Sequence, residues 1–260
     1  MELWKNTADG IEVYLHLIKI LSDNYVYILI WPGHAIVIDP GETDPIMEFL
    51  HEKNLTVSGV LNTHHHKDHT DGNCALKKKY DCPVIGPDDD RIPCLDQKVG
   101  EEELIVGPFG IDVIPSPGHT STHLVYFLPQ FKLLFSGDTL FGAGCGRLFE
   151  GTAKELYSSL QKISSLPEET LIFCGHEYTE KNLEFALTLE PDNEDIIKRL
   201  DQVRELLSKG LPSVPFTLAE EKKTNPFLRS HLAAIKKAID MEDATEIEIF
   251  ERLREMRNGF

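Results

Sequence analysis

The sequence predicts a layered α/β fold that is followed by a smaller region built from helices. Short runs rich in Val, Ile, Phe and Tyr alternate with helical patterns up to about residue 178. After that point the strand patterns disappear and only helical patterns continue. A chain of 260 residues can form one large domain together with a smaller one. We expect a first domain over residues 1–178 and a helical domain over residues 179–260.

The expected strands are bounded by Gly, Pro, Asn and Asp, which usually mark strand ends. They cover residues 11–21, 24–31, 34–39, 57–63, 83–86, 111–116, 123–129, 132–138 and 170–175. Helices are expected over residues 43–54, 71–81, 152–164, 181–190, 193–210, 231–240 and 244–258. Pro45 suits the first turn of its helix, and Gly210 is expected to end the helix that precedes it.

Charge and hydropathy limit the partners that this chain can have. The 26 Lys and Arg residues are outnumbered by 43 Asp and Glu residues, and the net charge of −17 argues against a nucleic-acid surface. The N-terminal residues lack the pattern of a signal peptide, and the apolar runs are too short to span a bilayer. We expect a cytoplasmic monomer with a small-molecule substrate and with neither a nucleic-acid nor a membrane partner.

The five cysteines are an odd number and include no C-x-x-C pair; they are Cys74, Cys82, Cys94, Cys145 and Cys174. This pattern predicts free thiols in a reducing compartment rather than a disulfide framework or a zinc finger. Cys145 and Cys174 lie near the candidate site residues described next, but no base accompanies them. We expect both to be packing residues.

Residues 63–69 read THHHKDH, which places four histidines and one aspartate in seven consecutive positions. Side chains two apart in an extended chain project to the same side, so His64 and His66 can reach one ion. Asp68 and His69 can serve a second ion, because imidazole and carboxylate groups suit zinc, iron or manganese. His65 alternates away from its neighbours and is expected to be structural or exposed. The remaining histidines carry no motif; they are His16, His34, His51, His123 and His231.

Three further segments share one layout, in which an apolar strand and a small-residue turn precede His119, Asp138 or His176. A lone histidine after a strand is usually a surface or hydrogen-bonded residue. However, the loops at the carboxyl ends of strands in α/β sheets are where ligands bind. Taken with residues 63–69, these segments supply more ligands than one ion can use. The pattern therefore favours two ions that share Asp138 as a bridge.

At these residues the sequence resembles the metallo-β-lactamase superfamily, whose signature is T-H-x-H-x-D-H. Over the whole chain it is most similar to the glyoxalase II family, the hydroxyacylglutathione hydrolases. The similar segments are LSDNYVYIL, THHHKDHTDGN, PSPGHTSTH, FSGDTLFGAGCGRLFEG, CGHEYTEKN and TLAEEKKTNPFLR. The resemblance implies an αββα sandwich with a C-terminal helical domain. It also implies hydrolysis of S-2-hydroxyacylglutathione, such as S-D-lactoylglutathione, to glutathione and D-lactate in methylglyoxal detoxification.

The resemblance assigns roles residue by residue. It places one divalent ion on His64, His66 and His119 and a second on Asp68, His69 and His176, with Asp138 bridging; zinc is expected, with iron or manganese as alternatives. It assigns substrate binding to Arg147, Tyr178, Asn182, Arg254 and Arg257. Three positions depart from the family pattern: Arg147 and Arg257 stand where lysine is common, and Phe149 replaces a tyrosine. For Arg254 and Arg257, a solvated helix face is the ordinary alternative.

The expected mechanism needs no serine or cysteine nucleophile. Paired metal ions lower the pKa of a shared water toward neutrality, and the resulting hydroxide attacks the thioester carbonyl. Asp68 and Asp138 are the expected catalytic carboxylates, and Asp68 also orients the hydroxide. The leaving thiolate has a pKa of about 8.5, so it departs with little help from an acid.

Other activities of the same superfamily are alternatives: a lactonase, a β-lactamase, a phosphodiesterase or RNase, and a persulfide dioxygenase with a single iron. The acidic charge opposes the RNase, and the missing export signal opposes the β-lactamase. A non-catalytic metal-binding or redox module, like the oxygen-reducing diiron proteins of this fold, is a further alternative. That class adds a flavin domain, for which this chain carries no signal.

Overall fold

The computed structural model describes residues 1–8 and 10–260, and the chain divides into two compact units. Unit 1 comprises Met1–Pro115 and Thr122–Gly137, and unit 2 comprises Ser116–Ser121 and Asp138–Phe260. A short loop of unit 2 is therefore inserted in the sequence of unit 1. The division expected after residue 178 stays a prediction.

Unit 1 contains a mixed sheet whose seven strands lie in the order of the sequence. The strands are β1 (Glu2–Ala8), β2 (Ile11–Ile20), β3 (Asn24–Trp31), β4 (His34–Ile38), β5 (Thr56–Leu61), β6 (Val84–Pro87) and β7 (Gln97–Val99). The pairs from β1 to β4 are antiparallel, and those from β4 to β7 are parallel. β3 is buried along nearly its whole length because both faces of the sheet are covered there.

Four further strands of unit 1 form an antiparallel meander: β8 (Glu103–Val106), β9 (Phe109–Pro115), β10 (Leu124–Leu128) and β11 (Leu133–Gly137). This meander packs face to face on the first sheet. The rings of Tyr27 and Phe135 are 5.6 Å apart, and Trp31 meets Phe109 edge to face at 5.2 Å. The aromatic pairs therefore hold the two sheets together.

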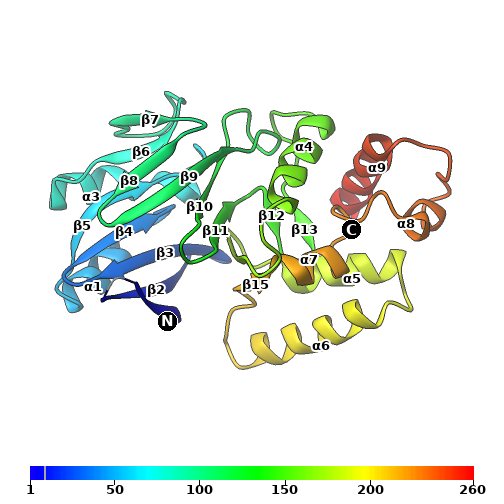
Figure 1. Cartoon of the computed structure of the whole chain (residues 1–260), viewed down its shortest axis with the longest axis horizontal. Helices are drawn as coiled ribbons and strands as arrows, with labels where there is room; N and C mark the ends of the chain where they lie inside the picture. Colours follow the sequence, from blue (N-terminus) through cyan, green and yellow to red (C-terminus); the bar gives the residue numbers. More distant parts are fainter. Residues whose placement is uncertain (9) are drawn as a thin grey trace. The chain divides into compact units, whose positions relative to one another are not determined.

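Helices α1 (Asp44–Glu52) and α3 (Asn73–Tyr80) pack on the other face of the first sheet, and Figure 1 shows them beside β4 and β5. Ile46 and Leu50 of α1 and Leu76 of α3 are fully buried against the apolar side chains of these strands. Pro45 lies in the first turn of α1, as the sequence predicts. A one-turn helix, α2 (Lys67–Thr70), lies within the THHHKDH segment.

Unit 2 is mostly helical, as its sequence patterns predict. Its helices are α4 (Ala153–Ser164), α5 (Thr179–Leu189), α6 (Glu194–Ser208), α7 (Leu218–Thr224), α8 (Ala233–Ala238) and α9 (Glu246–Gly259). α5 and α6 pack side by side through a small apolar cluster that includes Leu183 and Leu200 (Figure 1). Three helices begin with a capping box, at Thr152, Thr217 and Thr245. Gly210 follows α6 with a φ of +72°, as expected of a residue that ends a helix.

One short strand of unit 2, β15 (Phe216–Thr217), lies after residue 178 and corrects the expectation that strands disappear there. β14 (Leu171–Cys174) pairs with β15, and β12 (Leu140–Phe141) pairs with β13 (Gly144–Cys145). Two residues cannot show a period of two, so β12, β13 and β15 leave no pattern in the sequence. The β12–β13 hairpin becomes important at the candidate site.

The prediction of five free thiols is wrong for two of them, because Cys74 and Cys94 form a disulfide. The loop after β6 folds over the start of α3, where Asn73 Nδ2 donates to the Pro93 carbonyl at 3.2 Å. The Cα atoms of the two cysteines are thereby 5.4 Å apart, although 20 residues separate them in sequence. Cys82, Cys145 and Cys174 are free and buried. No helix in the described part of the chain has both the length and the apolar character needed to cross a bilayer.

The packing of the two sheets yields a testable prediction at Gly107, which turns β8 into β9. Its φ is +59°, and a Cβ there would lie 2.5 Å from the Trp31 ring. We expect Gly107→Ala to lower the free energy of unfolding by about 2 kcal/mol, because it adds left-handed strain and a clash. Gly100→Ala is the control, since no atom lies within 4 Å of its added Cβ. Equal urea midpoints for the two variants would contradict this prediction.

Candidate metal centre

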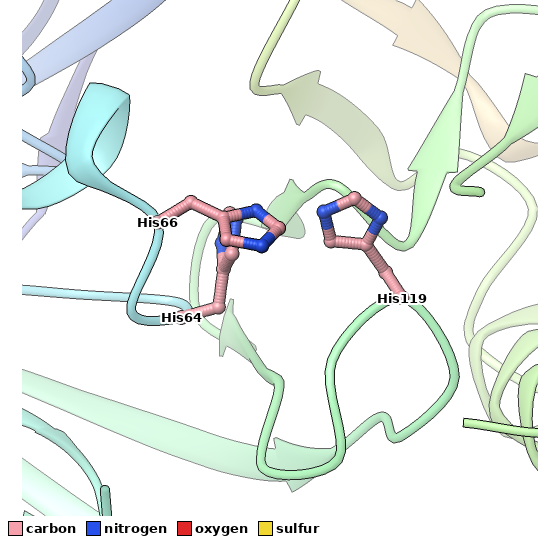
Figure 2. Close-up of side chains that lie close together, drawn as sticks. All are labelled: His64, His66 and His119. Carbon is pink, nitrogen blue, oxygen red and sulfur yellow. The ribbon is translucent and has the colours of Figure 1, made fainter. Parts of the chain in front are cut away.

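The loop after β5 brings the ligand-type residues of unit 1 together. His64 Nε2 lies 3.0 Å from His66 Nδ1, and Figure 2 shows these two rings side by side. Two nitrogen ligands of one tetrahedral zinc would lie about 3.3 Å apart, given Zn–N bonds near 2.0 Å. The pair therefore has nearly the spacing that one cation requires.

A buried carboxylate, Asp39, orients this loop from the end of β4. Its two oxygens accept hydrogen bonds from Thr63 N and Thr63 Oγ1, both at 2.7 Å, and Oδ2 lies 3.1 Å from His69 Nδ1. Asp39, His64 and His69 form a compact group of possible ligands. Because protein donors already engage Asp39, we interpret it as the residue that orients the ligands. Sequence analysis did not identify this role.

The hydrogen bonds decide which nitrogen of each imidazole stays available. Thr63 Oγ1 gives its single proton to Asp39, so it must accept one from His64 Nδ1, 3.0 Å away. His69 Nδ1 likewise donates to Asp39. In a neutral imidazole one protonated nitrogen leaves the other as a lone pair, which makes Nε2 the ligand atom in both residues.

Asp68 lies in α2 and is held by Asn24 at the start of β3. Asn24 Nδ2 donates to Asp68 Oδ2 at 2.8 Å and also contacts its carbonyl at 3.3 Å. Asp68 Oδ2 is 3.6 Å from His69 Nε2, so this carboxylate and this imidazole face each other as a second ligand pair. Asn24 belongs to the segment LSDNYVYIL, but nothing in the sequence alone indicates its contact with Asp68.

Two other histidines of unit 1 have different surroundings. His65 Nδ1 lies 3.5 Å from Asp89 Oδ2, and Arg91 holds the same carboxylate with two hydrogen bonds. This contact agrees with the structural role expected for His65. His123, expected to be ordinary, is fully buried and stacks on the His64 ring at 4.8 Å. It thereby helps to fix the plane of a candidate ligand.

Unit 2 presents the second group of candidate ligands around one carboxylate oxygen. Asp138 Oδ2 is 3.4 Å from His119 Nε2 and 3.3 Å from His176 Nε2. His119, also drawn in Figure 2, lies 3.0 Å through its Nδ1 from the Arg147 carbonyl, which can only accept. Its Nε2 therefore carries the lone pair, as it does in His64 and His69. An oxygen close to two imidazole nitrogens suits a ligand shared by two cations.

Glycine at position 146 permits this arrangement. A Cβ there would lie 2.1 Å from the Asp138 carbonyl oxygen and 3.0 Å from His119 Cβ. No other residue fits such a close approach of backbone to ligand. The glycine-rich segment expected to be a tight turn is therefore the β12–β13 hairpin, packed directly on the ligands of unit 2.

The substrate-binding candidates all lie in unit 2, and they differ in exposure. Arg147 is exposed, and Tyr178 is 36% exposed while its ring stacks on His176 at 4.9 Å. Asn182 is buried and donates from Nδ2 to the Gly142 carbonyl at 2.9 Å. Arg257 Nε donates to Asn182 Oδ1 at 2.9 Å, and Arg254 Nη1 donates to the Cys145 carbonyl at 2.6 Å.

Arg254 and Arg257 are therefore not on a solvated helix face, because only 4% and 8% of their surfaces are exposed. Burial lowers the pKa of the Arg257 guanidinium, and the nearby charges of Arg254 and Arg147 lower it further. These three arginines form a local positive cluster within an acidic chain. Phe149 is exposed and meets the His119 ring edge to face at 5.2 Å.

Comparisons with known proteins agree with this geometry. The model of the metallo-β-lactamase superfamily matches residues 22–176, and that of the hydroxyacylglutathione hydrolase C-terminus matches residues 177–260. The hydroxyacylglutathione hydrolases of Rhodospirillum rubrum and Methylobacillus flagellatus are 43% and 44% identical over 95% and 94% of this chain, covering 98% and 99% of theirs. The crystal structure of ETHE1 from Myxococcus xanthus is similar at a TM-score of 0.64 and 25% identity, over 94% of this chain and 97% of that one.

The chain is a member of the metallo-β-lactamase superfamily, and the expected α/β sandwich with a C-terminal helical region is confirmed. Within the superfamily it belongs to the hydroxyacylglutathione hydrolases. The family and the clustered imidazoles and carboxylates together support metal binding.

The orienting role of Asp39 can be tested by the substitution Asp39→Asn. The amide changes the hydrogen bonds that place Thr63 and His69, and loss of such outer partners typically weakens metal binding 10- to 100-fold. Competition with a chromophoric chelator measures the zinc affinity. Asp112→Asn, on an exposed position of β9, is the control and should bind zinc like the unmodified protein. Equal zinc affinities for the two variants would refute this role for Asp39.

The three free cysteines should be inert in the folded protein. Burial raises the pKa of the Cys82 and Cys174 thiols and raises the pKa of the Cys145 thiol to about 11. A raised thiol pKa removes the reactive thiolate at pH 7.5. Mass spectrometry after brief iodoacetamide treatment should find these residues unmodified until the chain is unfolded. Rapid alkylation of Cys145 or Cys174 in the native protein is the contrary result.

Proposed function

We propose that this chain hydrolyses the thioester of S-2-hydroxyacylglutathione, with S-D-lactoylglutathione as substrate, to glutathione and D-lactate. Methylglyoxal detoxification is the process that this reaction serves. The observation that carries the proposal is the similarity to hydroxyacylglutathione hydrolases along almost the whole chain, with every expected ligand residue present. No observation favours one of the alternative activities.

We infer that the expected ligand residues hold two divalent ions. His64, His66 and His119 would bind one ion, Asp68, His69 and His176 the other, and Asp138 would bridge them. The hydrogen bonds of the imidazoles support this inference, because they leave Nε2 of His64, His69 and His119 unprotonated and able to bind a metal ion. Imidazole and carboxylate donors suit zinc, which we propose as the metal, with iron or manganese as alternatives.

The bound ions would supply Lewis acidity and a coordinated water whose pKa is near neutral. We expect the Asp68 carboxylate to orient that water, and the hydrogen bond from Asn24 supports this role because it holds the carboxylate. The water would give up one proton to solvent and form a bond through its oxygen to the thioester carbonyl carbon, and the carbon–sulfur bond would then break to release the hydroxy acid. The sulfur leaves as a thiolate, with a pKa of about 8.5, and takes up a proton from solvent. A cysteine nucleophile is opposed by the raised pKa of the buried thiols.

We propose that residues 1–178 form the catalytic domain and residues 179–260 the substrate-binding domain. Arg147 and Tyr178 are exposed enough to touch the glutathione moiety directly. Asn182 and Arg254 bond to the hairpin, so they contribute mainly by holding it, while Arg257 adds positive charge. Phe149 lacks the hydroxyl of the family tyrosine, so one hydrogen bond to the carrier is missing.

A cytoplasmic monomer acting on a small molecule, with no nucleic-acid or membrane partner, is part of the same proposal. The acidic charge of −17 supports the absence of a nucleic-acid partner. The Cys74–Cys94 disulfide removes one argument for the cytoplasm, since disulfides are uncommon in reducing compartments.

The proposal is tested by steady-state kinetics on S-D-lactoylglutathione and on the S-lactoyl thioester of N-acetylcysteamine, which lacks the γ-glutamyl and glycyl ends. We expect kcat/KM to be about 100-fold higher for the glutathione thioester, which corresponds to about 2.8 kcal/mol of carrier recognition. Chelation should abolish activity, and metal analysis should find two ions per chain. A lactone, a chromogenic lactam and a phosphodiester serve as comparison substrates. Metal-loaded protein that leaves the glutathione thioester intact would contradict the proposal.

Arg147 should contribute to substrate affinity more than to chemistry. Its exposed guanidinium can pair with a carboxylate of glutathione, and loss of about 1.4 kcal/mol corresponds to a tenfold change. We expect Arg147→Ala to raise KM for S-D-lactoylglutathione about tenfold and to leave kcat nearly unchanged. Lys154→Ala, which removes another exposed cation of unit 2, should leave KM unchanged. The opposite pattern, in which kcat falls and KM is constant, would place Arg147 in the chemical step.

A further inference from the structure

Side chains from three distant segments of the chain bind the backbone of the β12–β13 hairpin. Asn182 of α5 donates to the Gly142 carbonyl, and Arg254 of α9 donates to the Cys145 carbonyl. Asn225, which follows α7, donates from Nδ2 to the Gly144 carbonyl at 3.0 Å. Side chains from outside the hairpin therefore hold three of its backbone carbonyls.

The turn of the hairpin contains an alanine in an unfavourable conformation. Ala143 has a φ of +53°, which lies in the left-handed region that glycine favours, and the residue is fully buried. Its backbone N–H points to Glu221 of α7, with Oε1 and Oε2 at 3.1 and 3.0 Å. A hydrogen bond to an ionised carboxylate is stronger than one to a neutral acceptor. The contact with Glu221 therefore stabilises the strained turn.

Glu221 is itself held in one position although it is fully buried. Arg199 Nη2 of α6 pairs with Oε1 at 2.6 Å, and Asn225 Nδ2 donates to Oε2 at 2.7 Å. Burial raises the pKa of the Glu221 carboxyl, and the Arg199 charge opposes that shift. Both partners are buried, with Glu221 0% and Arg199 6% exposed, so neither can readily exchange its contacts for solvent. The Glu221 carboxylate is thus held in one position, and the hairpin is bound to it through the Ala143 N–H.

The hairpin connects Glu221 to the candidate metal ligands of unit 2. Its next residue, Gly146, packs against Asp138 and His119, and the Arg147 carbonyl accepts from His119 Nδ1. A shift of the turn at Ala143 would move that carbonyl and, with it, the imidazole that it orients. Outer partners of metal-binding histidines affect metal affinity in this way.

We propose that Glu221, paired with Arg199, is a positioning residue that sets the metal-binding orientation of His119 by holding Ala143 in its left-handed conformation. Its consequence for thioester hydrolysis rests on the proposed function, whereas its consequence for metal affinity does not. No role in the reaction is assigned to Glu221 itself, which contacts backbone and buried side chains of unit 2.

The test is a double-mutant cycle on zinc affinity, measured by chelator competition for Glu221→Gln, Ala143→Gly and the double variant. We expect Glu221→Gln to weaken zinc binding about tenfold. In the Ala143→Gly background the same substitution should weaken zinc binding less than about threefold, because glycine adopts the left-handed conformation without the contact to Glu221. Rescue of this kind would not follow from a general loss of stability. Equal losses in both backgrounds, or no loss in either, would overturn the proposal.

Two further variants keep the test decisive. Glu220→Gln changes the exposed neighbour on the same helix and should leave zinc affinity unchanged, since glutamine also completes a capping box. If Glu221→Gln fails to fold because Arg199 loses its partner, Arg199→Met/Glu221→Leu replaces the pair with apolar groups of similar size. This variant should also bind zinc about tenfold more weakly, and wild-type affinity in it would refute the role of Glu221.

Thioester hydrolysis by the unmodified protein, assayed in the same preparations, separates the two proposals. Unmodified protein that binds zinc but does not hydrolyse the thioester would contradict the proposed function. The double-mutant cycle would still decide the role of Glu221, because it depends on zinc affinity alone.

Discussion

Three of the candidate imidazole ligands depend on a hydrogen bond made by the other ring nitrogen. His64 is oriented by the Thr63 hydroxyl, His69 by Asp39 and His119 by the Arg147 carbonyl. A neutral imidazole has one donor and one acceptor, so an acceptor fixed at Nδ1 leaves Nε2 as the lone pair. The sheets, the turns and the hairpin matter to the site mainly because they place these acceptors.

The charge distribution adds a second constraint. A chain with a net charge of −17 repels an anionic substrate at long range, so binding the carboxylates of a glutathione thioester needs a local positive region. Arg147, Arg254 and Arg257 provide one within unit 2, and their mutual repulsion contributes to the lowered pKa of Arg257. The buried bonds of Arg254 and Arg257 to Cys145 and Asn182 hold these like charges near one another.

Much of the candidate site was predictable because each ligand motif is local in sequence. The spacing in THHHKDH and the strand–turn–ligand layout at His119, Asp138 and His176 require no knowledge of distant contacts. Longer strands and helices were predictable in the same way, since five or more residues show a period. Two-residue strands such as β13 and β15 show none, and the pairing of Cys74 with Cys94 depends on how a loop folds over α3.

The sequence by itself determined the types of ligand, the fold class and the family, because these follow from residue identity and short-range periodicity. Only the tertiary structure decided which side chains orient those ligands. Asp39, Asn24, His123 and Glu221 act on residues that lie between 24 and 78 positions away along the chain. No local pattern records such contacts, since they arise only when packing brings separate segments to one place.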